Sequence, residues 1–366
     1  MNILYIANIR LPTEKAHGIQ IMKMCEAFAD LGHTIELVVP TRHTHITEDA
    51  FSYYGVARIF ALTKLTVPDW VRFGRVGFLS SLLIFSERAR WLKHFWSADI
   101  IYSRDALVLL QYMLLGRCIV FEAHTKPSRA ARFVARRAHK VVVISRALKE
   151  AYIASGVSEE KIIVAHDAVD EHLFDSVASK EITRATLTIP RTSTVIMYVG
   201  HLYAHKGVAT LAQVAEHMPD NQFIFVGGTE RDIAYFRKQW GSIQNINIVG
   251  HMSPAKVPQY LRTADVLVIP NSAKNEDASK FTSPMKLFEY MASGTPIVAS
   301  RVPSLQEVLT ENEAVFFTPD DAGALTDSIN EVLSNEKESH ERTENAKQKV
   351  ARYTWKKRAE RICKFI

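Results

Sequence analysis

Apolar and polar positions follow a repeating order of strand, helix and strand along this chain. Near the beginning, residues 3–7 and 34–39 form apolar runs, and between them apolar side chains recur every three or four positions until Gly32. This is the pattern of a β-α-β unit. Further strands are predicted in the first half at residues 99–102, 117–121 and 140–144.

The second half repeats this order more regularly. Apolar runs predict strands at residues 195–199, 223–226, 247–249, 266–269 and 296–299. The segments between them predict helices near residues 208–217, 231–239, 254–262 and 284–293. Strands that alternate with helices form parallel sheets covered on both faces. The sequence therefore predicts an α/β fold with doubly wound parallel sheets.

The length of 366 residues suggests two domains, at roughly 150 residues per domain. The least apolar stretch, residues 175–194, is the predicted linker. We therefore expect one domain at 1–175, a second at 176–345, and a C-terminal helix at 346–366 that packs back on the first domain. Two doubly wound domains are expected to face each other across a deep cleft, with ligands at the carboxyl ends of the strands.

Composition narrows the class of protein. Hydrophobic residues make up 47% and charged residues 23% of the chain, which is typical of a globular protein. No apolar run reaches the roughly 18 residues of a membrane-spanning helix. The first residues lack a basic segment before their apolar run, so we interpret them as a strand rather than a signal peptide. Three well-separated cysteines without a C-x-x-C pair favour a reduced, cytoplasmic protein.

The net charge of +6 is unevenly distributed. Residues 69–140 hold 13 Lys and Arg against 5 Asp and Glu, and the tail from Asn345 holds eight basic residues and one acid. Such zones attract nucleic acid, an anionic membrane or a phosphorylated substrate. Basic residues mixed with aromatic ones suit an anionic membrane or a lipid-linked diphosphate, and the alternative is a core helix with a solvated basic face. The aromatic residues are Trp70, Phe73, Phe78, Phe85, Trp91, Phe95 and Trp96.

Several common motifs are absent. The chain has no G-x-G dinucleotide fingerprint, no G-x-x-x-x-G-K-[ST] loop, no D-x-D pair and no G-x-S-x-G elbow. His43 and His45, with Glu48 and Asp49, could ligate a metal, but a polar loop after the second strand is the favoured interpretation. We therefore expect neither a metal nor a cofactor. No nucleic-acid recognition motif is present, and we expect no nucleic-acid partner.

A glycine-bounded loop at residues 200–207 follows a predicted strand and precedes a predicted helix. Gly200 allows the backbone to approach a ligand closely. Lys206 supplies a compact positive charge near the next helix start, where free amides also favour an anion. The alternative is a glycine turn with a solvated lysine.

A second motif begins the helix predicted at 284–293. Ser283 is a suitable N-cap and Pro284 a suitable first helical residue. The amides of Met285, Lys286 and Leu287 would then be free to bind a phosphate.

Glu289 lies in the next turn of the same predicted helix. Its carboxylate can accept two hydrogen bonds from a vicinal diol such as a ribose. It stands among residues that look buried, where an unpaired carboxylate is costly, so we expect it to have a partner. Together with Lys286 and the amides, Glu289 indicates a nucleotide diphosphate site. The alternative is an ordinary capped helix with a surface glutamate.

The pattern S-P-x-K-x-x-E-Y-M-A-x-G-x-P-I-V at residues 283–298 resembles the donor-site signature of the family-4 retaining glycosyltransferases, which have the GT-B fold of two Rossmann-like domains. Residues 18–34, 143–148, 200–207 and 264–270 are also similar to that family. The resemblance covers nearly the whole chain. It implies that the first domain binds the acceptor and that the second binds the nucleotide-sugar donor.

The resemblance also implies residue roles. Lys206 would neutralise the diphosphate, Glu289 would hold the ribose hydroxyls, and His124 matches the histidine that contacts the donor sugar. These three form the expected catalytic set, although without the resemblance His124 would be interpreted as a loop histidine. Gly18 would lie in a loop that meets the diphosphate. The implied donor-binding set is Gly18, Gly200, His201, Lys206, Ser283, Pro284, Met285, Lys286, Leu287 and Glu289.

Three positions depart from the family pattern. His201 stands where an arginine is frequent, so the diphosphate depends more on the two lysines. Phe281 stands where many members carry a second glutamate, so the sugar cannot be inferred from that position. Only one glycine, Gly18, stands where a pair is common.

The implied reaction transfers a sugar from a UDP- or GDP-linked donor with retention of configuration and without a metal. The leaving phosphate would take the proton of the acceptor in a front-face attack. We expect a lipid-linked or cell-surface glycan acceptor, a role in polysaccharide biosynthesis, and peripheral association with the inner face of an anionic membrane. The alternatives are a sugar-nucleotide epimerase of the same fold and a non-catalytic nucleotide-sugar-binding subunit.

Overall fold

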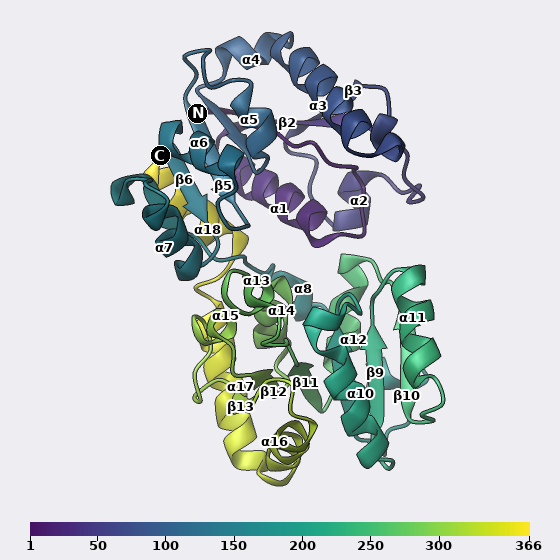
Figure 1. The fold of residues 1–366 in the computed structure, drawn as a ribbon. Coiled ribbons are helices and arrows are strands. Elements are labelled where there is room, and N and C mark those ends of the chain that lie inside the picture. The colour runs from purple at the N-terminus through teal and green to yellow at the C-terminus, as the bar shows by residue number, and fades with distance from the viewer. The chain divides into compact units, whose positions relative to one another are not determined.

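Two parallel sheets organise the chain, each within its own unit (Figure 1). In the computed structural model, which describes residues 1–366, unit 1 comprises Met1–His166 and Trp355–Ile366, and unit 2 comprises Asp167–Thr354. The unit boundaries therefore differ from those predicted at residues 175 and 345. Helix α17 (Glu336–Val350) stays in unit 2, where it packs on α14, and only α18 (Trp355–Phe365) returns to unit 1, where it packs on α1.

Unit 1 contains a seven-stranded parallel sheet in the order β3-β2-β1-β4-β5-β6-β7. The order reverses between β1 and β4, which marks the point where ligands bind doubly wound sheets. Its strands are β1 (Asn2–Ile6), β2 (Thr34–Thr41), β3 (Ala61–Thr66), β4 (Ile100–Ser103), β5 (Ile119–Ala123), β6 (Lys140–Val143) and β7 (Ile162–Val164). Its helices before α18 are α1 (Ala16–Asp30), α2 (Ala50–Tyr54), η1 (Trp70–Phe73), α3 (Gly74–Arg90), α4 (Lys93–Ser97), α5 (Ala106–Leu110), α6 (Arg129–Arg137), α7 (Arg146–Ala154) and η2 (Glu159–Lys161).

Unit 2 contains a six-stranded parallel sheet in the order β10-β9-β8-β11-β12-β13, which reverses between β8 and β11. Its strands are β8 (Val195–Val199), β9 (Gln222–Val226), β10 (Ile246–Gly250), β11 (Val266–Ile269), β12 (Ile297–Ser300) and β13 (Val315–Phe317). Its helices before α17 are α8 (His172–Asp175), α9 (Lys180–Thr186), η3 (Ala204–Lys206), α10 (Val208–His217), α11 (Glu230–Trp240), η4 (Pro254–Lys256), α12 (Val257–Thr263), α13 (Glu276–Lys280), α14 (Met285–Ser293), α15 (Pro303–Gln306) and α16 (Ala322–Ser334). The prediction of two doubly wound α/β domains is confirmed.

The predicted linker at 175–194 is wrong, because part of it is a packed helix. Helix α9 packs on α12, and the Arg184 side chain, only 5% exposed, donates to the backbone carbonyl of Thr263. Arg184 and Lys180 both lie 2.6 Å from carboxylate oxygens of Asp265, just before β11. The polar residues of this stretch therefore anchor it to the rest of unit 2, to which it belongs.

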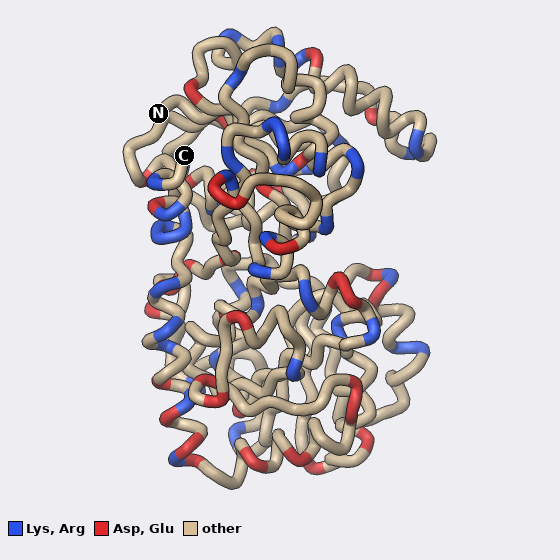
Figure 2. Tube along the Cα trace, turned by 60° about the vertical axis from the view of Figure 1, so that its left-hand side comes forward, with Lys and Arg blue, Asp and Glu red and all other residues tan.

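Charge divides between the units. Unit 1 holds 27 Lys and Arg against 15 Asp and Glu, whereas unit 2 holds 18 against 24. Figure 2 shows these residues along the trace. The excess positive charge of the chain therefore belongs to unit 1.

Candidate functional site

In unit 2, two loops lie against each other at the point where the strand order reverses. One follows β8 and the other follows β11. The Ser272 N–H donates to the carbonyl of His205, at 3.2 Å. Gly207 has φ +70°, and a Cβ there would lie 1.6 Å from the carbonyl oxygen of Pro270, so only glycine fits. The loop at residues 200–207 is thus positioned at the carboxyl edge where a ligand is expected.

The side chain of Lys286, in the first turn of α14, reaches this loop. A Cβ on Gly200, which has φ +140°, would lie 2.9 Å from Lys286 Nζ. The ammonium lies 3.8 Å from the ring centroid of Tyr198, and it is buried with no hydrogen-bond partner in the chain. A buried charge without a bonded partner is costly, so this arrangement suits an anion supplied from outside.

Lys206 adds a second positive charge to the same place. Burial, together with the charge of Lys206, lowers the pKa of Lys286 well below its ordinary value. Burial also lowers the pKa of Lys206. A bound diphosphate would relieve the repulsion between the two ammonium groups.

Glu289 lies one turn after Lys286 on α14 and is partly exposed. Burial raises the pKa of Glu289 to about 7, and the charge of Lys286 opposes this rise. None of the hydrogen bonds in the chain reaches its carboxylate. The partner expected for Glu289 is therefore the neighbouring charge of Lys286 rather than a hydrogen-bond donor of the protein.

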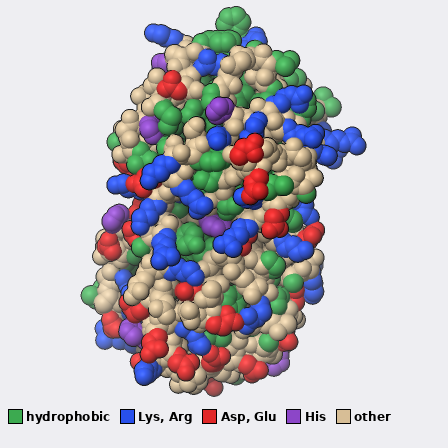
Figure 3. Space-filling view, turned by 90° about the vertical axis from the view of Figure 1, so that its left-hand side faces the viewer, with side chains coloured by type: hydrophobic (Ala, Val, Ile, Leu, Met, Phe, Trp, Pro, Cys, Tyr) green, Lys and Arg blue, Asp and Glu red, His purple; other side chains and the backbone are tan.

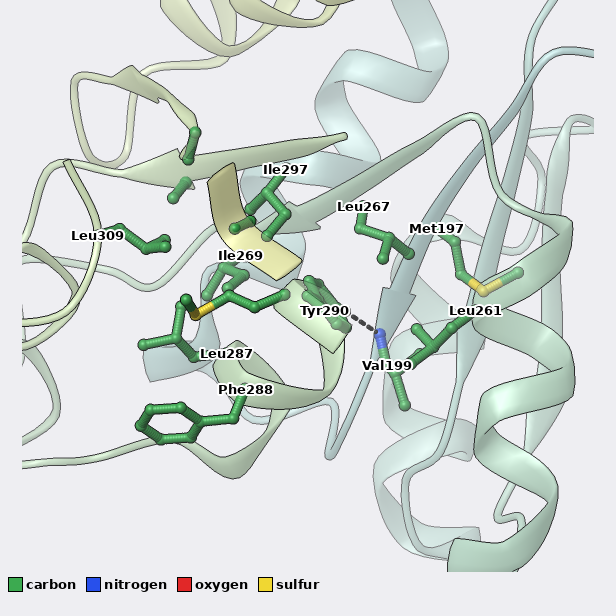
Figure 4. Close-up of a cluster of buried hydrophobic side chains, with 14 of the residues drawn as sticks. Met197, Val199, Leu261, Leu267, Ile269, Leu287, Phe288, Tyr290, Ile297 and Leu309 are labelled. Atoms are coloured by element: carbon green, nitrogen blue, oxygen red, sulfur yellow. Dashed lines mark hydrogen bonds between the residues drawn. The ribbon is translucent and has the colours of Figure 1, made fainter. Parts of the chain in front are cut away.

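Tyr290, in the second turn of α14, fixes this helix to the end of β8. The Val199 N–H donates to the Tyr290 hydroxyl at 2.7 Å, which is the dashed line in Figure 4. Leu287, Phe288 and Tyr290 are all buried in one apolar cluster with strands β8 and β11. The core thus holds Lys286 next to Gly200.

The predicted cap of this helix is wrong. Helix α14 begins at Met285, Pro284 occupies the N-cap position, and no side chain caps the helix. The Ser283 hydroxyl instead accepts a hydrogen bond from the Asp167 N–H at 2.9 Å. The Leu287 amide donates to the carbonyl of Pro284, at 2.9 Å, so it is not free as predicted. The first-turn amides available to an anion are those of Met285 and Lys286.

His201 takes part in a stack of rings. Its ring lies 4.9 Å from that of Tyr203, nearly parallel, and Tyr203 in turn stacks on His205. His201 Nδ1 also lies 3.5 Å from a carboxylate oxygen of Asp232. The histidine is thereby held beside Gly200.

Asn271 is a polar residue of this site that sequence reasoning missed. It follows β11, its side chain is fully buried, and neither its amide nitrogen nor its amide oxygen has a hydrogen-bond partner. Most buried polar atoms are paired. Its position directly after a buried parallel strand, where ligands bind, is the feature of the sequence that could have identified it.

In unit 1, Gly18 is not in a loop as expected. It lies in the first turn of α1, which begins at Ala16. A Cβ on Gly18 would lie 2.1 Å from the hydroxyl oxygen of Tyr54, so packing between α1 and α2 requires glycine.

His124 follows β5 and belongs to a buried network. Its Nε2 lies 2.7 Å from an oxygen of Glu122. Burial, with the charge of Arg104, lowers the pKa of His124 to about 4, so the ring is neutral near pH 7. A neutral ring that binds a carboxylate through Nε2 carries its proton there, and Nδ1 is left as an acceptor.

The Glu122 carboxylate is the centre of that network. It is fully buried and also accepts hydrogen bonds from Gln20 of α1 at 2.7 Å, Tyr102 of β4 at 2.5 Å and Arg358 of α18 at 2.8 Å. Burial alone would raise the pKa of Glu122, but Arg358 and His124 hold it well below its ordinary value. The network joins the C-terminal helix to strand β5, which directly precedes His124.

Of the residues considered as metal ligands at 43–49, Asp49 has a structural role. Asp49 caps α2 by accepting from the N–H groups of Phe51 and Ser52, and it pairs with Arg58 at 2.7 Å. The structure contains no group of three or more His, Cys, Asp or Glu side chains arranged to hold a metal ion. None of its helices combines the length and the apolar character that crossing a membrane requires.

Two Rossmann-like units of this kind define the GT-B class of fold. Residues 18–173 match the model of Glycosyltransferase Family 4, and residues 179–349 match that of Glycosyl transferases group 1. The chain therefore belongs to the group 1 and family 4 glycosyltransferases, as the resemblance indicated.

Solved structures with the same fold include sucrose-phosphate synthase from Thermosynechococcus elongatus, with a TM-score of 0.81 at 19% identity over 100% of this chain and 98% of that one. HepE from Anabaena, solved in complex with UDP-glucose, has a TM-score of 0.77 at 17% identity, again over 100% and 98%. Phosphatidyl-myo-inositol mannosyltransferase of Mycobacterium tuberculosis is 30% identical over 179 residues, 45% of each chain. The chain spans less than half the length of the first curated relatives it matches.

Proposed function

We propose that this protein is a glycosyltransferase that moves a sugar from a nucleotide-diphosphate sugar to an acceptor. The observation that carries the proposal is the buried Lys286 ammonium, which has no hydrogen-bond partner and lies beside Gly200 and the charge of Lys206. A diphosphate supplies the missing hydrogen-bond acceptor and the negative charge for both lysines. Membership of the family and the similarity to HepE, whose structure holds UDP-glucose, support this donor class.

The chemistry follows from where charge develops. The bond between the sugar and the diphosphate breaks, a bond from the acceptor oxygen to the same carbon forms on the same face, and the acceptor proton passes to the leaving phosphate. Lys206 and Lys286, with the first amides of α14, stabilise the charge on that phosphate without a metal. Glu289 holds the ribose hydroxyls, and His124 accepts a hydrogen bond from the transferred sugar through Nδ1.

The test is release of nucleoside diphosphate from a panel of UDP- and GDP-sugars in EDTA, with candidate acceptors present and absent. Lys206→Ala is expected to lose about 2–3 kcal/mol of transition-state stabilisation, about a hundredfold in turnover. Lys280→Gln is the control, because Lys280 is an exposed lysine of α13 paired with Glu276. Wild-type turnover by Lys206→Ala would refute the assignment. Turnover of the sugar without an acceptor would indicate an epimerase, and binding without turnover a non-catalytic subunit.

We also propose peripheral association with an anionic membrane, at its cytoplasmic face, where a lipid-linked glycan intermediate would be the acceptor. The aromatic residues predicted to meet the membrane include both buried and exposed side chains. Phe85 and Phe95 belong to the core. Phe73 and Trp91 are 63% and 77% exposed, beside arginines. Figure 3 shows exposed hydrophobic side chains among Lys and Arg on one face. Flotation with anionic liposomes at moderate salt tests this, and lack of lipid-dependent binding would remove it.

A further inference from the structure

A basic cavity lies in unit 1. Its volume is about 820 Å³, and its walls come from the segments that follow β1, β2 and β3 and from the start of α1. These are the carboxyl ends of parallel strands, where doubly wound sheets bind ligands. The cavity was not predicted from the sequence.

Positive charge dominates its walls. Arg10, Lys15, Arg42 and Arg72 line the cavity, against the single carboxylate of Asp69. Of these four cations, only Arg10 forms a close ion pair. Its partner is Glu14, at 2.7 Å, which does not line the cavity. Lys15, Arg42 and Arg72 are therefore available to a ligand.

Arg42 is held in place by a neutral partner. Its Nη2 donates to the amide oxygen of Asn8 at 2.5 Å, which orients the guanidinium without cancelling its charge. The carboxylates of Asp69 and Asp105 act on it from a longer range. A fixed guanidinium with free N–H groups suits the planar oxygen pairs of a phosphate.

An apolar surface adjoins this basic wall. Trp70 lines the cavity and is 42% exposed, and Phe73, three residues later, is 63% exposed. The guanidinium of Arg72 lies 4.8 Å from the ring centroid of Phe73. One short helix, η1, thus presents a cation and apolar rings to the same region.

We propose that this cavity binds a phosphate group carried by the acceptor of the glycosyl transfer. The role of the ligand as an acceptor rests on the proposed function. The presence of a phosphate group on it is inferred from the cavity alone. A neutral glycan would leave the charges of Lys15, Arg42 and Arg72 largely uncompensated, whereas a phosphate dianion, together with the carboxylate of Asp69, balances them. The phosphate can belong to a free phosphorylated sugar or to a lipid, and the two sources differ in their use of the apolar surface beside it.

The experiment observes the cavity directly in the full chain. The protein is labelled with 5-fluorotryptophan, and the ¹⁹F resonance of Trp70 is assigned with Trp70→Phe. Inorganic phosphate and short-chain dihexanoyl phosphatidic acid are then titrated separately. Both are expected to shift the Trp70 resonance saturably. Tighter binding of the lipid, by about tenfold, assigns the source to a lipid, and equal binding assigns it to a free phosphate ester.

Variants locate the binding. Arg72→Gln and Arg42→Gln are each expected to weaken the binding of both probes about tenfold, the loss of one charge-assisted hydrogen bond. Arg90→Gln is the control, because Arg90 lies beside Trp91 and outside the cavity. Arg72 is exposed, so its substitution should leave the fold intact. A Trp70 resonance that does not move, or that moves equally in Arg72→Gln and the wild type, would overturn the proposal.

The readout separates this proposal from the proposed function. Release of nucleoside diphosphate depends on Lys206 and Lys286, whereas the Trp70 shift depends on the unit 1 cavity. A Trp70 shift in a protein that turns over no nucleotide sugar would leave the phosphate site standing and refute the transfer reaction. Turnover of a nucleotide sugar without a Trp70 shift would support the transfer reaction and refute the phosphate site.

Discussion

Arg358→Met is the substitution that probes unit 1 most sharply. Arg358 is 4% exposed and binds a fully buried carboxylate, that of Glu122, at 2.8 Å. It also donates to the carbonyls of His166 and Ala165. Removing it leaves Glu122 with neutral donors only. Breaking one partner of a buried pair typically costs about 3–5 kcal/mol. That is a large share of a domain stability of roughly 5–15 kcal/mol.

The assay is calorimetric and urea unfolding of the full chain at neutral pH. Arg361→Met, an exposed position of the same helix, is the matched control and is expected to change stability by less than about 0.5 kcal/mol. The double variant Glu122→Gln with Arg358→Met should recover part of the loss, because no buried charge is then left alone. A cost below about 1 kcal/mol for Arg358→Met, or no recovery in the double variant, would show that Arg358 is not the essential counter-ion of Glu122.

Three further predictions concern the two units. Tyr290→Phe leaves the buried Val199 N–H unbonded and should lower stability by about 1–3 kcal/mol in urea unfolding, whereas no loss would contradict the anchor. Nucleoside diphosphate binding should take up protons above neutral pH, because the anion raises the depressed pKa of Lys286; calorimetry in buffers of different ionisation enthalpy should show this, and buffer-independent heats would contradict it. Burial lowers the pKa of His124 and of His166 from 6.5 to about 4. Between pH 6.5 and pH 4, the unfolded chain therefore binds protons at these two histidines that the folded chain does not bind. Stability should therefore fall from pH 6.5 to 4, by at most ~3 kcal/mol for each histidine, and thermal scans that are flat over this range would contradict it.

The central strands were predictable because burial on both faces makes them apolar throughout. Strands β8 and β11 are buried at every position, and the sequence predicts both with these bounds. Strand β3 was missed because it lies at the edge of its sheet and is half exposed. Strands β7 and β13 were missed because each has only three residues.

The predicted site divides in the same way. Gly200, Lys206, Lys286 and Glu289 are predicted to act together, and in unit 2 Lys286 lies beside Gly200 and its pKa is affected by the charges of Lys206 and Glu289. Local sequence carries this signal because each residue belongs to a short motif at a strand end.

Other features depend on contacts between distant parts of the sequence. Glu122 and Arg358 are separated by 236 positions, and no local pattern relates them. Ser283 has the composition of an N-cap, but its hydroxyl binds the Asp167 N–H, 116 positions away. The missed features are therefore those that only tertiary packing creates.

The most direct measurement is a crystal structure of the protein soaked with a UDP- or GDP-sugar in the presence of EDTA. We expect a diphosphate bound to the ammonium groups of Lys206 and Lys286 and to the amide of Met285, with the ribose diol on Glu289. A diphosphate bound elsewhere, or a loop at Gly200 that stays empty at saturating nucleotide sugar, would contradict it.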